Sequence, residues 1–356
     1  MKQIILLLLL AISTTSLAGK TKEVYVHIGF KGDIDNLIEK KKSMSFSYDL
    51  DTEDPINIEN HFGDVKVKFW NQNQIKVNIT VTANAPTEKK VNAFLSIVDI
   101  DRTTENGEVK FVTNLHCLES SFVNNVSKGH KDEDKNFLRV DYQVYMPKGH
   151  DLTVNNSHGD VYIPEFHDVL NLTQDYGTLF ADHLVNDNSS IDVNFGKAFI
   201  KSMVGGKLKS TQTSLIIDRV EDVAMTNQCG SVQVLEANNT DIKASYTKGY
   251  VGKVNESCKF TVNYSKEFRL GEILADVQEL EITSSHTNLE LPLCMKGKFD
   301  LVSNSNNTDI IMTKSSKVKY INTANNTEYY IIGDQNNTSH ATKILLSTNY
   351  GRVKVK

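Results

Sequence analysis

The sequence predicts an all-β fold, a β-solenoid with coils of about 18–20 residues and one amphipathic helix in an N-terminal insertion. Two observations predict it. A repeat motif, in which two alternating segments flank a small-residue turn, occurs at 56–69, at 151–163 and at 345–355. Small or turn-forming residues also recur at a nearly constant spacing, at Gly159, Gly177, Gly196, Ser214, Gly230 and Gly249.

Residues 1–18 have the pattern of a secretory signal peptide. Lys2 precedes an apolar run from Ile4 to Ile12, and the small residues Ser16 and Ala18 occupy the −3 and −1 positions of a cleavage site. No later window approaches about 18 consecutive apolar residues, so no transmembrane segment is predicted in the mature chain. We therefore expect an exported protein in the periplasm, at the outer-membrane surface or outside the cell.

Charge and cysteine content exclude several classes of partner. The formal net charge is −5, and acidic and basic residues are interleaved, so neither a nucleic acid nor a membrane surface is an expected partner. The cysteines have no CxxC spacing, and metal binding is not indicated. One or two disulfides are permitted in an oxidising compartment, with the pairing open. The four cysteines are Cys117, Cys229, Cys258 and Cys294.

The N-terminal segment, residues 19–55, contains two predicted strands and one predicted helix. Val24–Ile28 is a plausible strand, and Ile34–Lys42 is polar enough for a short exposed helix. Ser43–Leu50 alternates apolar and polar residues, which is the strand period. Pro55 then separates this segment from the first copy of the repeat motif.

Residues 56–150 are predicted to form a first coil followed by an α/β insertion. Strands are expected at 65–69, 75–83, 107–114 and 138–146, and the charged segment 127–136 is expected to form a loop. The one helix is expected at Thr87–Val98, because Pro86 and Thr87 give a helix-start signal. Its apolar residues have the i, i+3, i+4, i+7 spacing of a helix that packs on a sheet, namely Val91, Phe94, Leu95 and Val98.

Residues 151–356 are predicted to form the solenoid repeats. Each repeat holds two short strands joined at a corner, where glycine or asparagine is expected to take a positive φ. One coil alone cannot cover its apolar residues, so stacking is required. In the later coils Asn288, Asp309 and Glu328 are expected at the turn position, and Gly351 is the next glycine expected there. The predicted inward residues are Val154, Val161, Leu172, Leu179, Val193, Ile200, Leu215, Ile217, Val232, Val234, Val262, Ile282 and Leu289.

These residues resemble the putative adhesin domain family, exported bacterial domains of unknown function that are common in Bacteroidota. The resemblance is carried by the segments 62–70, 75–83 and 142–161 and by the pairs Tyr176-Gly177, Phe195-Gly196 and Tyr350-Gly351. It covers nearly the whole mature chain. The resemblance implies a right-handed, β-helix-like solenoid and an envelope location, without an identified ligand. The turns after Phe268 depart from the family pattern.

Polar residues at the corners suggest two kinds of site. His158, Asp160, His167, Asp168 and Asp175 follow one another in neighbouring repeats, and carboxylate pairs on a β-helix face are what sugar-cleaving enzymes use. Regular aspartates in exported repeats also bind calcium, but the Gly-Gly-x-Gly-x-Asp form is missing. Because Asp, Asn and His also suit wet turns, no catalytic, cofactor or metal residue is assigned.

Asn-x-Ser/Thr triplets are interpreted as corner chemistry, because Asn-rich turns next to Ser or Thr generate them by chance. They begin at Asn78, Asn171, Asn238, Asn255, Asn306, Asn325 and Asn336.

The sequence thus predicts an exported, non-enzymatic, adhesin-like structural or binding protein of the bacterial envelope. Its expected partner is a carbohydrate or another envelope protein, with no cofactor. The alternative is a polysaccharide-acting enzyme on a β-helix scaffold. A third interpretation is assembly through an uncapped last strand at Tyr350–Lys356. There Arg352, Lys354 and Lys356 would discourage edge pairing, so a monomer is expected.

Overall fold

The computed structural model describes residues 10–11, 25–32, 37–105, 107–116, 137–274, 277–293, 298–312, 318–322, 327–333 and 341–356. Within these ranges the fold is all-β with one short helix, as the sequence predicts. The chain divides into two compact units, residues 1–180 (unit 1) and 181–356 (unit 2). The predicted loop at 127–136 and the cysteines Cys117 and Cys294 lie outside the described residues.

Among its described residues, unit 1 holds twelve strands, the helix α1 and the start of β13. The first six strands are β1 (Leu10–Ala11), β2 (Tyr25–Gly32), β3 (Ile38–Asp49), β4 (Ile56–His61), β5 (Val65–Phe69) and β6 (Gln74–Ala85). After α1 (Glu88–Ser96) come β7 (Val98–Glu105), β8 (Glu108–Leu115), β9 (Phe137–Met146), β10 (Leu152–Ser157), β11 (Val161–Ile163), β12 (Leu170–Asp175) and β13 (Thr178–Val185).

Parallel, in-register strands stack the copies of the repeat motif in unit 1. β10 lies between β4 and β12, so that Val154 is opposite both Ile58 and Leu172. All three side chains are buried. Ile58 and Val154 are neighbours although the whole α/β insertion separates them in the sequence, whereas Val154 and Leu172 come from consecutive repeats. The first two copies of the motif are therefore direct neighbours, and the predicted period holds from β10 to β12.

The predicted helix at Ile34–Lys42 is wrong from Ile38 onward, where β3 begins. β3 pairs antiparallel with β6 on one side and with β2 on the other. The lysine-rich start of β3 has no alternation of apolar and polar residues. It is a strand because its backbone is hydrogen-bonded to a neighbouring strand on each side. Lys40 lies among these residues, and its buried ammonium donates to Asn92 Oδ1 (3.1 Å) and lies 3.4 Å from Glu88 Oε1.

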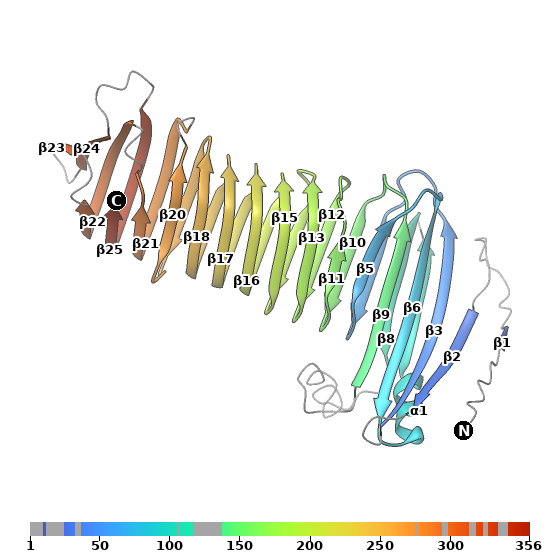
Figure 1. The fold of residues 1–356 in the computed structure, drawn as a ribbon. Helices are drawn as coiled ribbons and strands as arrows, with labels where there is room; N and C mark the ends of the chain where they lie inside the picture. The colour runs from blue at the N-terminus through green and yellow to red at the C-terminus, as the bar shows by residue number, and fades with distance from the viewer. Residues whose placement is uncertain are drawn as a thin grey trace. The chain divides into compact units, whose positions relative to one another are not determined.

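The predicted amphipathic helix is confirmed as α1. The N-cap residue Thr87 accepts a hydrogen bond from the backbone N–H of Lys90 (3.3 Å). Val91 and Phe94 form the buried face of α1, and the helix lies at one end of β3 and β6 (Figure 1). The helix therefore completes the core of unit 1 with the apolar residues that the sequence identifies.

Unit 2 begins within β13 and contains the remaining strands. They are β14 (Ser190–Asn194), β15 (Lys197–Val204), β16 (Lys207–Glu221), β17 (Ala224–Asn238), β18 (Asp241–Asn255) and β19 (Cys258–Asn263). After these come β20 (Phe268–Ile273), β21 (Glu279–Leu291), β22 (Lys298–Met312), β23 (Val318–Asn322), β24 (Thr327–Gly333) and β25 (Thr342–Val355).

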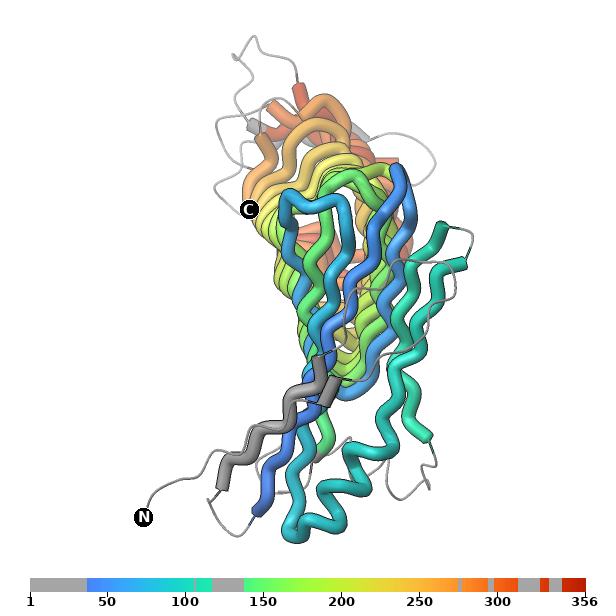
Figure 2. The backbone as a smooth tube through the Cα atoms, turned by 90° about the vertical axis from the view of Figure 1, so that its right-hand side faces the viewer, coloured from blue at the N-terminus to red at the C-terminus, as the bar shows by residue number. Residues whose placement is uncertain are grey.

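Strands β16, β17 and β18 pair in parallel with a constant offset. Leu215 lies opposite Val232, and Val232 lies opposite Gly249, so the residue number rises by the same amount from each strand to the next. The strands run side by side in Figure 1, and successive turns of unit 2 appear as nested loops in Figure 2. The sequence predicts two short strands in each repeat, but here they form one long strand that bends at a corner.

All thirteen residues predicted to point inward are buried. Their alternation is local: along β17, Val232 and Val234 are buried while Gln233 between them is exposed. The two-residue period of a strand thus assigns the inner and outer faces before the stacking is known.

The corners differ from the prediction in which residue takes the positive φ. At most corners this residue is not glycine, and in many of them it is an aromatic residue or histidine preceding the small residue. Tyr176, for example, has φ +53° beside Gly177. A Cβ on Gly177 would collide with the carbonyl oxygen of Gly159, which belongs to the neighbouring corner. Glycine is therefore required at this corner for close approach of two backbones, not for its φ.

The register also corrects the predicted corner positions in unit 2. Thr213 lies opposite Gly230, which lies opposite Thr247, so the predicted turn residues Ser214 and Gly249 fall one and two positions too late. Each threonine hydroxyl donates to the carbonyl oxygen two residues earlier, at 2.9 Å. Gly249 points inward, where its missing side chain leaves room for the ring of Phe268.

The last strands depart from sequence order. The C-terminal strand β25 pairs in parallel with both β21 and β22. Gly351 lies opposite Thr287 and Thr308, so the predicted turn residues Asn288 and Asp309 fall one position too late. β24 pairs antiparallel with β22 and β23, and Glu328 is therefore not at a corner of the parallel stack.

Candidate functional site

Asp160 links neighbouring repeats in unit 1. Its carboxylate accepts the backbone N–H of Thr178 (2.9 Å), and its own N–H donates to the carboxylate of Asp64 (3.1 Å). The Asp64 N–H in turn donates to the carboxylate of Asp141 (2.9 Å). Arg139 lies 2.7 Å from both Asp64 and Asp141. The predicted corner carboxylate is thus one member of a repeated structural contact.

The other predicted polar residues do not gather around Asp160. Asp168 accepts the N–H of Gly149 (2.8 Å), at the start of β10, and His167 contacts Glu165 at 2.7 Å. Asp160 lies beyond the opposite end of β10, and six residues of a strand span about 20 Å. The two aspartates are therefore too far apart for the carboxylate pair that an enzyme of this kind requires.

His158 belongs instead to a column of stacked rings at the corner of unit 1. Its ring lies between Phe62 and Tyr176, with centroids 5.0 and 4.9 Å away. All three residues have positive φ, and they occupy equivalent corners in successive repeats. Ring stacking between repeats thus accompanies the unusual backbone conformation.

A second column occupies the corner of unit 2 and is formed by Tyr246, Tyr264, His286 and Tyr350. Successive ring centroids are 5.0, 4.9 and 5.0 Å apart, and the ring planes differ by 7–24°. About half of each tyrosine is exposed. Because neighbouring rings cover one another's faces, the column presents ring edges and hydroxyl groups to solvent. Inside the column, therefore, no aromatic ring face is open to stack against a sugar.

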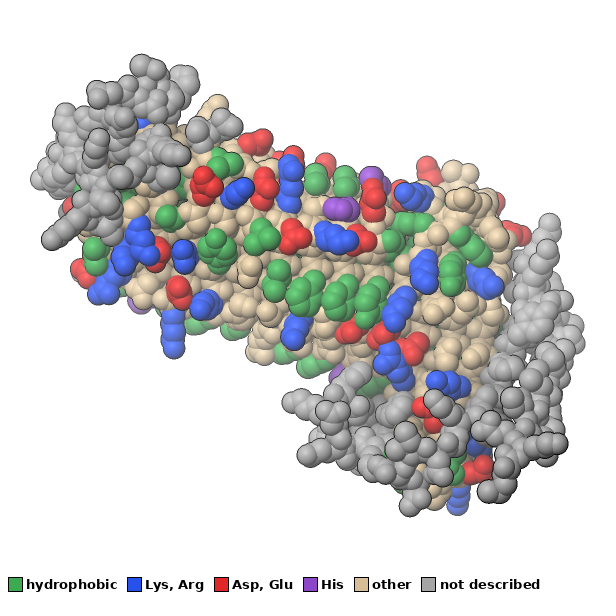
Figure 3. Space-filling view, in the orientation of Figure 1, with side chains coloured by type: hydrophobic (Ala, Val, Ile, Leu, Met, Phe, Trp, Pro, Cys, Tyr) green, Lys and Arg blue, Asp and Glu red, His purple; other side chains and the backbone are tan. Residues whose placement is uncertain are grey.

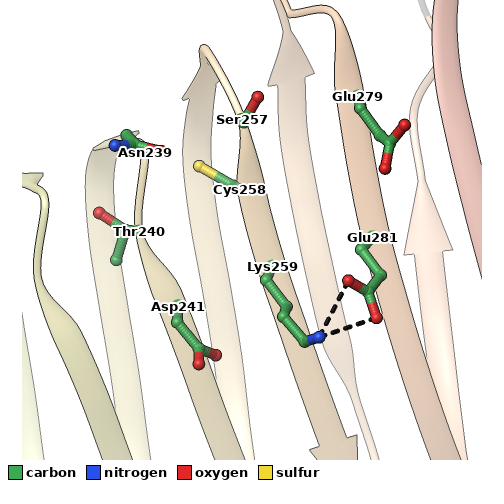
Figure 4. A pocket seen from close by; sticks show the side chains of 8 residues that line it. All are labelled: Asn239, Thr240, Asp241, Ser257, Cys258, Lys259, Glu279 and Glu281. Carbon is green, nitrogen blue, oxygen red and sulfur yellow. Dashed lines mark hydrogen bonds and ion pairs between the residues drawn. The ribbon is translucent and has the colours of Figure 1, made fainter.

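Among the described residues, unit 2 carries one hollow where strands begin and another on an outer sheet face. The first, the strand-start hollow, has a volume of about 370 Å³ and lies at the beginnings of β18, β19 and β21 (Figure 4). Its charged residues are Asp241, Lys259, Glu279 and Glu281.

Lysine partners balance the acidic residues of the strand-start hollow. Lys259 Nζ points toward Glu281 (2.9 Å), and this hydrogen bond raises the pKa of the lysine (Figure 4). Glu279 pairs with Lys343 (3.1 Å), and Asp241 with Lys243 (3.4 Å). Each carboxylate that lines this hollow thus already has an ammonium group within salt-bridge distance.

The second hollow, the sheet-face hollow, has a volume of about 340 Å³ and lies on the outer face of β16, β17, β18 and β20. Its floor is low because Ser214 and Ser231 are small, and their hydroxyl groups are hydrogen-bonded to each other (3.1 Å). Beside them runs a row of larger outward residues in register, namely Ile216, Gln233, Tyr250 and Arg269.

Charged groups close one end of the sheet-face hollow. Lys248 Nζ lies 3.4 Å from Glu267, and Arg269 lies 5.7 Å from the ring centroid of Tyr250. Figure 3 shows hydrophobic side chains in short rows beside acidic and basic ones on the face it presents. The hollow thus combines an apolar wall with hydroxyl, amide and guanidinium groups. Sequence reasoning missed it, although Ile216 and Tyr250 are large apolar residues at outward positions.

Cys229 and Cys258 carry free thiols. Burial raises the pKa of the Cys258 thiol to about 11, whereas Cys229 is half-buried at a corner. At pH 8 we therefore expect iodoacetamide to label Cys229 much faster than Cys258, as measured by peptide mass spectrometry. Because the fold favours the neutral Cys258 thiol, its contribution to stability is present below its ordinary pKa of 9.0 and is lost as the pH rises toward 11. Equal labelling of both thiols in the folded protein would contradict this.

Among the described residues, no helix is long and apolar enough to cross a membrane. No group of three or more His, Cys, Asp or Glu side chains in the same residues is arranged to hold a metal ion.

Comparisons with known proteins identify similar solved structures only. No family model matches the chain, and no curated protein matches it. A putative cell adhesion protein from Clostridium sporogenes covers 89% of this chain and 99% of its own, with 9% identity and a TM-score of 0.21. A putative adhesin from Bacteroides fragilis covers 88% and 97%, with 10% identity and a TM-score of 0.26. A putative lipid binding protein from Parabacteroides distasonis covers the same shares, with 9% identity and a TM-score of 0.27.

The names of the adhesin and the cell adhesion protein are consistent with the adhesin domain family that the sequence resembles. At TM-scores below 0.5 the likeness carries no functional argument, and a functional conclusion has to come from the chain's own geometry.

Proposed function

We propose that this chain is an exported, non-enzymatic, adhesin-like binding protein whose repeats form a β-solenoid. Support for the solenoid comes from the parallel, in-register strands of each unit, which pair β10 with β12 and pair β16, β17 and β18 at one constant offset. In such a scaffold, each coil buries its apolar side chains against the next coil, and these contacts between neighbours stabilise repeat proteins. A scaffold of this kind presents long, regular faces to solvent.

The sheet-face hollow is the observation that carries the binding role. Tyr250 and Ile216 supply apolar surface, and Gln233, Ser231 and Arg269 supply hydrogen-bonding groups beside it. Binding sites combine concave apolar surface with a few convergent polar groups in this way. All five residues stand on paired strands, so the site is formed before a ligand arrives.

A carbohydrate is the ligand that fits this chemistry best. A sugar ring has an apolar face and a rim of hydroxyl groups, which match a tyrosine and its amide, hydroxyl and guanidinium neighbours. The hollow lies on the outer face of four neighbouring strands, so it suits a segment of a polysaccharide chain. An envelope protein remains the second candidate ligand of the same face.

Replacing Tyr250 by alanine is expected to reduce glycan binding at least about tenfold, because it removes the aromatic wall of the hollow. The measurement is a glycan array with the mature chain, followed by titration of the best glycan. Tyr264→Ala is the matched control, since this tyrosine lies in the corner column. Equal loss in both variants, or no binding of any glycan by the folded wild-type chain, would overturn the carbohydrate assignment.

The enzyme alternative has less support from the geometry. The carboxylates of Asp160 and Asp168 accept backbone N–H groups at opposite ends of β10. The carboxylates of the strand-start hollow are paired with lysines. Hydrolysis of the glycan that binds best, abolished by Glu281→Gln but not by Tyr250→Ala, would favour the enzyme instead.

Export is proposed from the pattern of residues 1–18. It places the mature chain in the bacterial envelope or outside the cell, where a binding face is useful. N-terminal sequencing of the protein recovered from its native compartment is expected to begin at Gly19. Recovery with Met1 still attached would contradict export through this pathway.

A further inference from the structure

The C-terminal strand β25 is inserted between two strands that precede it in the chain. It pairs with β21 from Glu279↔Lys343 to Leu291↔Val355 and with β22 from Phe299↔Thr342 to Met312↔Val355. If β25 left this position between β21 and β22 (the slot), these two strands would flank a gap about 10 Å wide.

The slot binds β25 along its whole length through side chains as well as backbone. Ile344, Leu346, Val353 and Val355 are at most 2% exposed. The Thr342 hydroxyl donates to the carbonyl oxygen of Val277 (2.7 Å), and Gly351 leaves space for the carbonyl oxygen of Thr287. A segment that entered the slot would need this alternation of apolar residues and a small residue at the corner.

Charge complementarity distinguishes this segment from the other strands. Residues 342–356 contain four basic residues and no acidic residue. Lys343 lies between Glu279 of β21 and Asp300 of β22, and its ammonium is 3.1 Å from Glu279. The strand therefore carries positive charge into a slot whose flanking strands place acidic residues opposite it.

The far end of β25 repeats this arrangement. Arg352 lies opposite Asp309, and Lys354 lies opposite Glu290, which also pairs with the Lys356 ammonium. Assembly through the last strand would require an uncapped edge at Tyr350–Lys356, whereas β25 is paired on both sides. The basic residues that the sequence suggested would repel a neighbouring strand instead match the acidic residues on both sides.

We propose that the slot between β21 and β22 is a strand-binding site whose ligand is the segment 342–356 of this chain, taken in cis within one copy and in trans from a second copy. Addition of a strand to two open edges supplies backbone hydrogen bonds, while the buried pockets and acidic flanks supply specificity. Exchange of an identical terminal element between copies links them without any new interface. The occupied slot gives the monomer that the sequence predicts, and an exchanged strand gives a linked pair.

The test uses the full chain with its own strand weakened by I344A and V353A. A fluorescent peptide of residues 342–356 is titrated against this variant and against the wild-type chain. We expect the variant to bind the peptide at least about tenfold more tightly, because the tethered wild-type strand outcompetes a free one. A peptide carrying K343E, R352E and K354E, with all apolar residues kept, should bind the variant at least about tenfold more weakly. Absence of binding by a folded variant, or equal binding of both peptides, would overturn the proposal.

If the variant does not fold, hydrogen exchange on the wild-type chain tests whether β25 leaves the slot. Under native conditions the amides of 342–355 are expected to exchange together and at least about tenfold faster than those of β17 and β18, because the strand leaves the slot as a unit. Exchange of these amides only with global unfolding of unit 2 would show that the segment is not separable, and would overturn the proposal.

Discussion

Replacing Gly159 by alanine is expected to lower the free energy of unfolding of unit 1 by about 3 kcal/mol. The added Cβ would collide with the carbonyl oxygen of Gly63 in the neighbouring corner. That backbone cannot move away, because the N–H of Phe62 donates to the carbonyl oxygen of Ser157 (2.8 Å). The N–H of His158 makes the next such bond, to Asp175 (2.9 Å), so a shift at one corner is passed to the next.

Gly149→Ala is the matched control for this prediction. Gly149 has φ +90°, but a Cβ there would have no heavy atom within 4 Å. Its replacement costs only backbone strain, about 1 kcal/mol. Urea denaturation of both variants separates the two roles of glycine. A larger loss at Gly149 than at Gly159 would show that conformational freedom, not close approach, determines where glycine occurs.

Replacing Asn156 by leucine is expected to cost about 3 kcal/mol, because Asn156 is the middle of a buried amide ladder. Its side-chain oxygen accepts from Asn60 Nδ2 (3.1 Å), and its Nδ2 donates to Gln174 Oε1 (3.1 Å). All three side chains are at most 3% exposed. Leucine removes both hydrogen bonds and leaves the buried Gln174 oxygen without this donor. A buried polar group without a hydrogen-bond partner costs about 1–3 kcal/mol.

Asn155→Leu is the control for the amide ladder, since Asn155 is exposed on the same strand. It is expected to change the free energy of unfolding by less than about 0.5 kcal/mol. Thermal melting followed by circular dichroism compares the two variants. Similar melting temperatures for Asn156→Leu and the wild-type chain would show that the ladder adds nothing to stability.

The buried rows could be predicted from the sequence because they depend on local alternation. Val154 and Leu172 are inward whether or not the coils stack, since a strand's two faces are set by its two-residue period. The corners could not be predicted in the same way. Tyr176 and His158 adopt positive φ where their rings stack between adjacent repeats, and that contact is absent from any single repeat.

The order of the last strands in the sheet could not be predicted from the sequence either. The Tyr350-Gly351 pair fits a corner next to many coils, and adjacency in the chain favours placing β25 after β24. The slot between β21 and β22 becomes evident only when Lys343 is seen opposite Glu279 and Asp300, and Arg352 opposite Asp309. The sheet-face hollow was missed for a related reason, because Tyr250 and Ser231 come together from different coils.

Deletion of one coil tests the proposed solenoid most directly. Ala224 lies opposite Asp241, so removal of 224–240 takes out one whole coil and joins Val223 to the equivalent position of the next coil. Every remaining strand keeps its register, and we expect a β-rich circular dichroism spectrum with a cooperative melt. Removal of 224–231 shifts the register, which should abolish the cooperative melt. If the whole-coil deletion unfolded the chain as fully as the shorter one, the stacked-coil account would be contradicted.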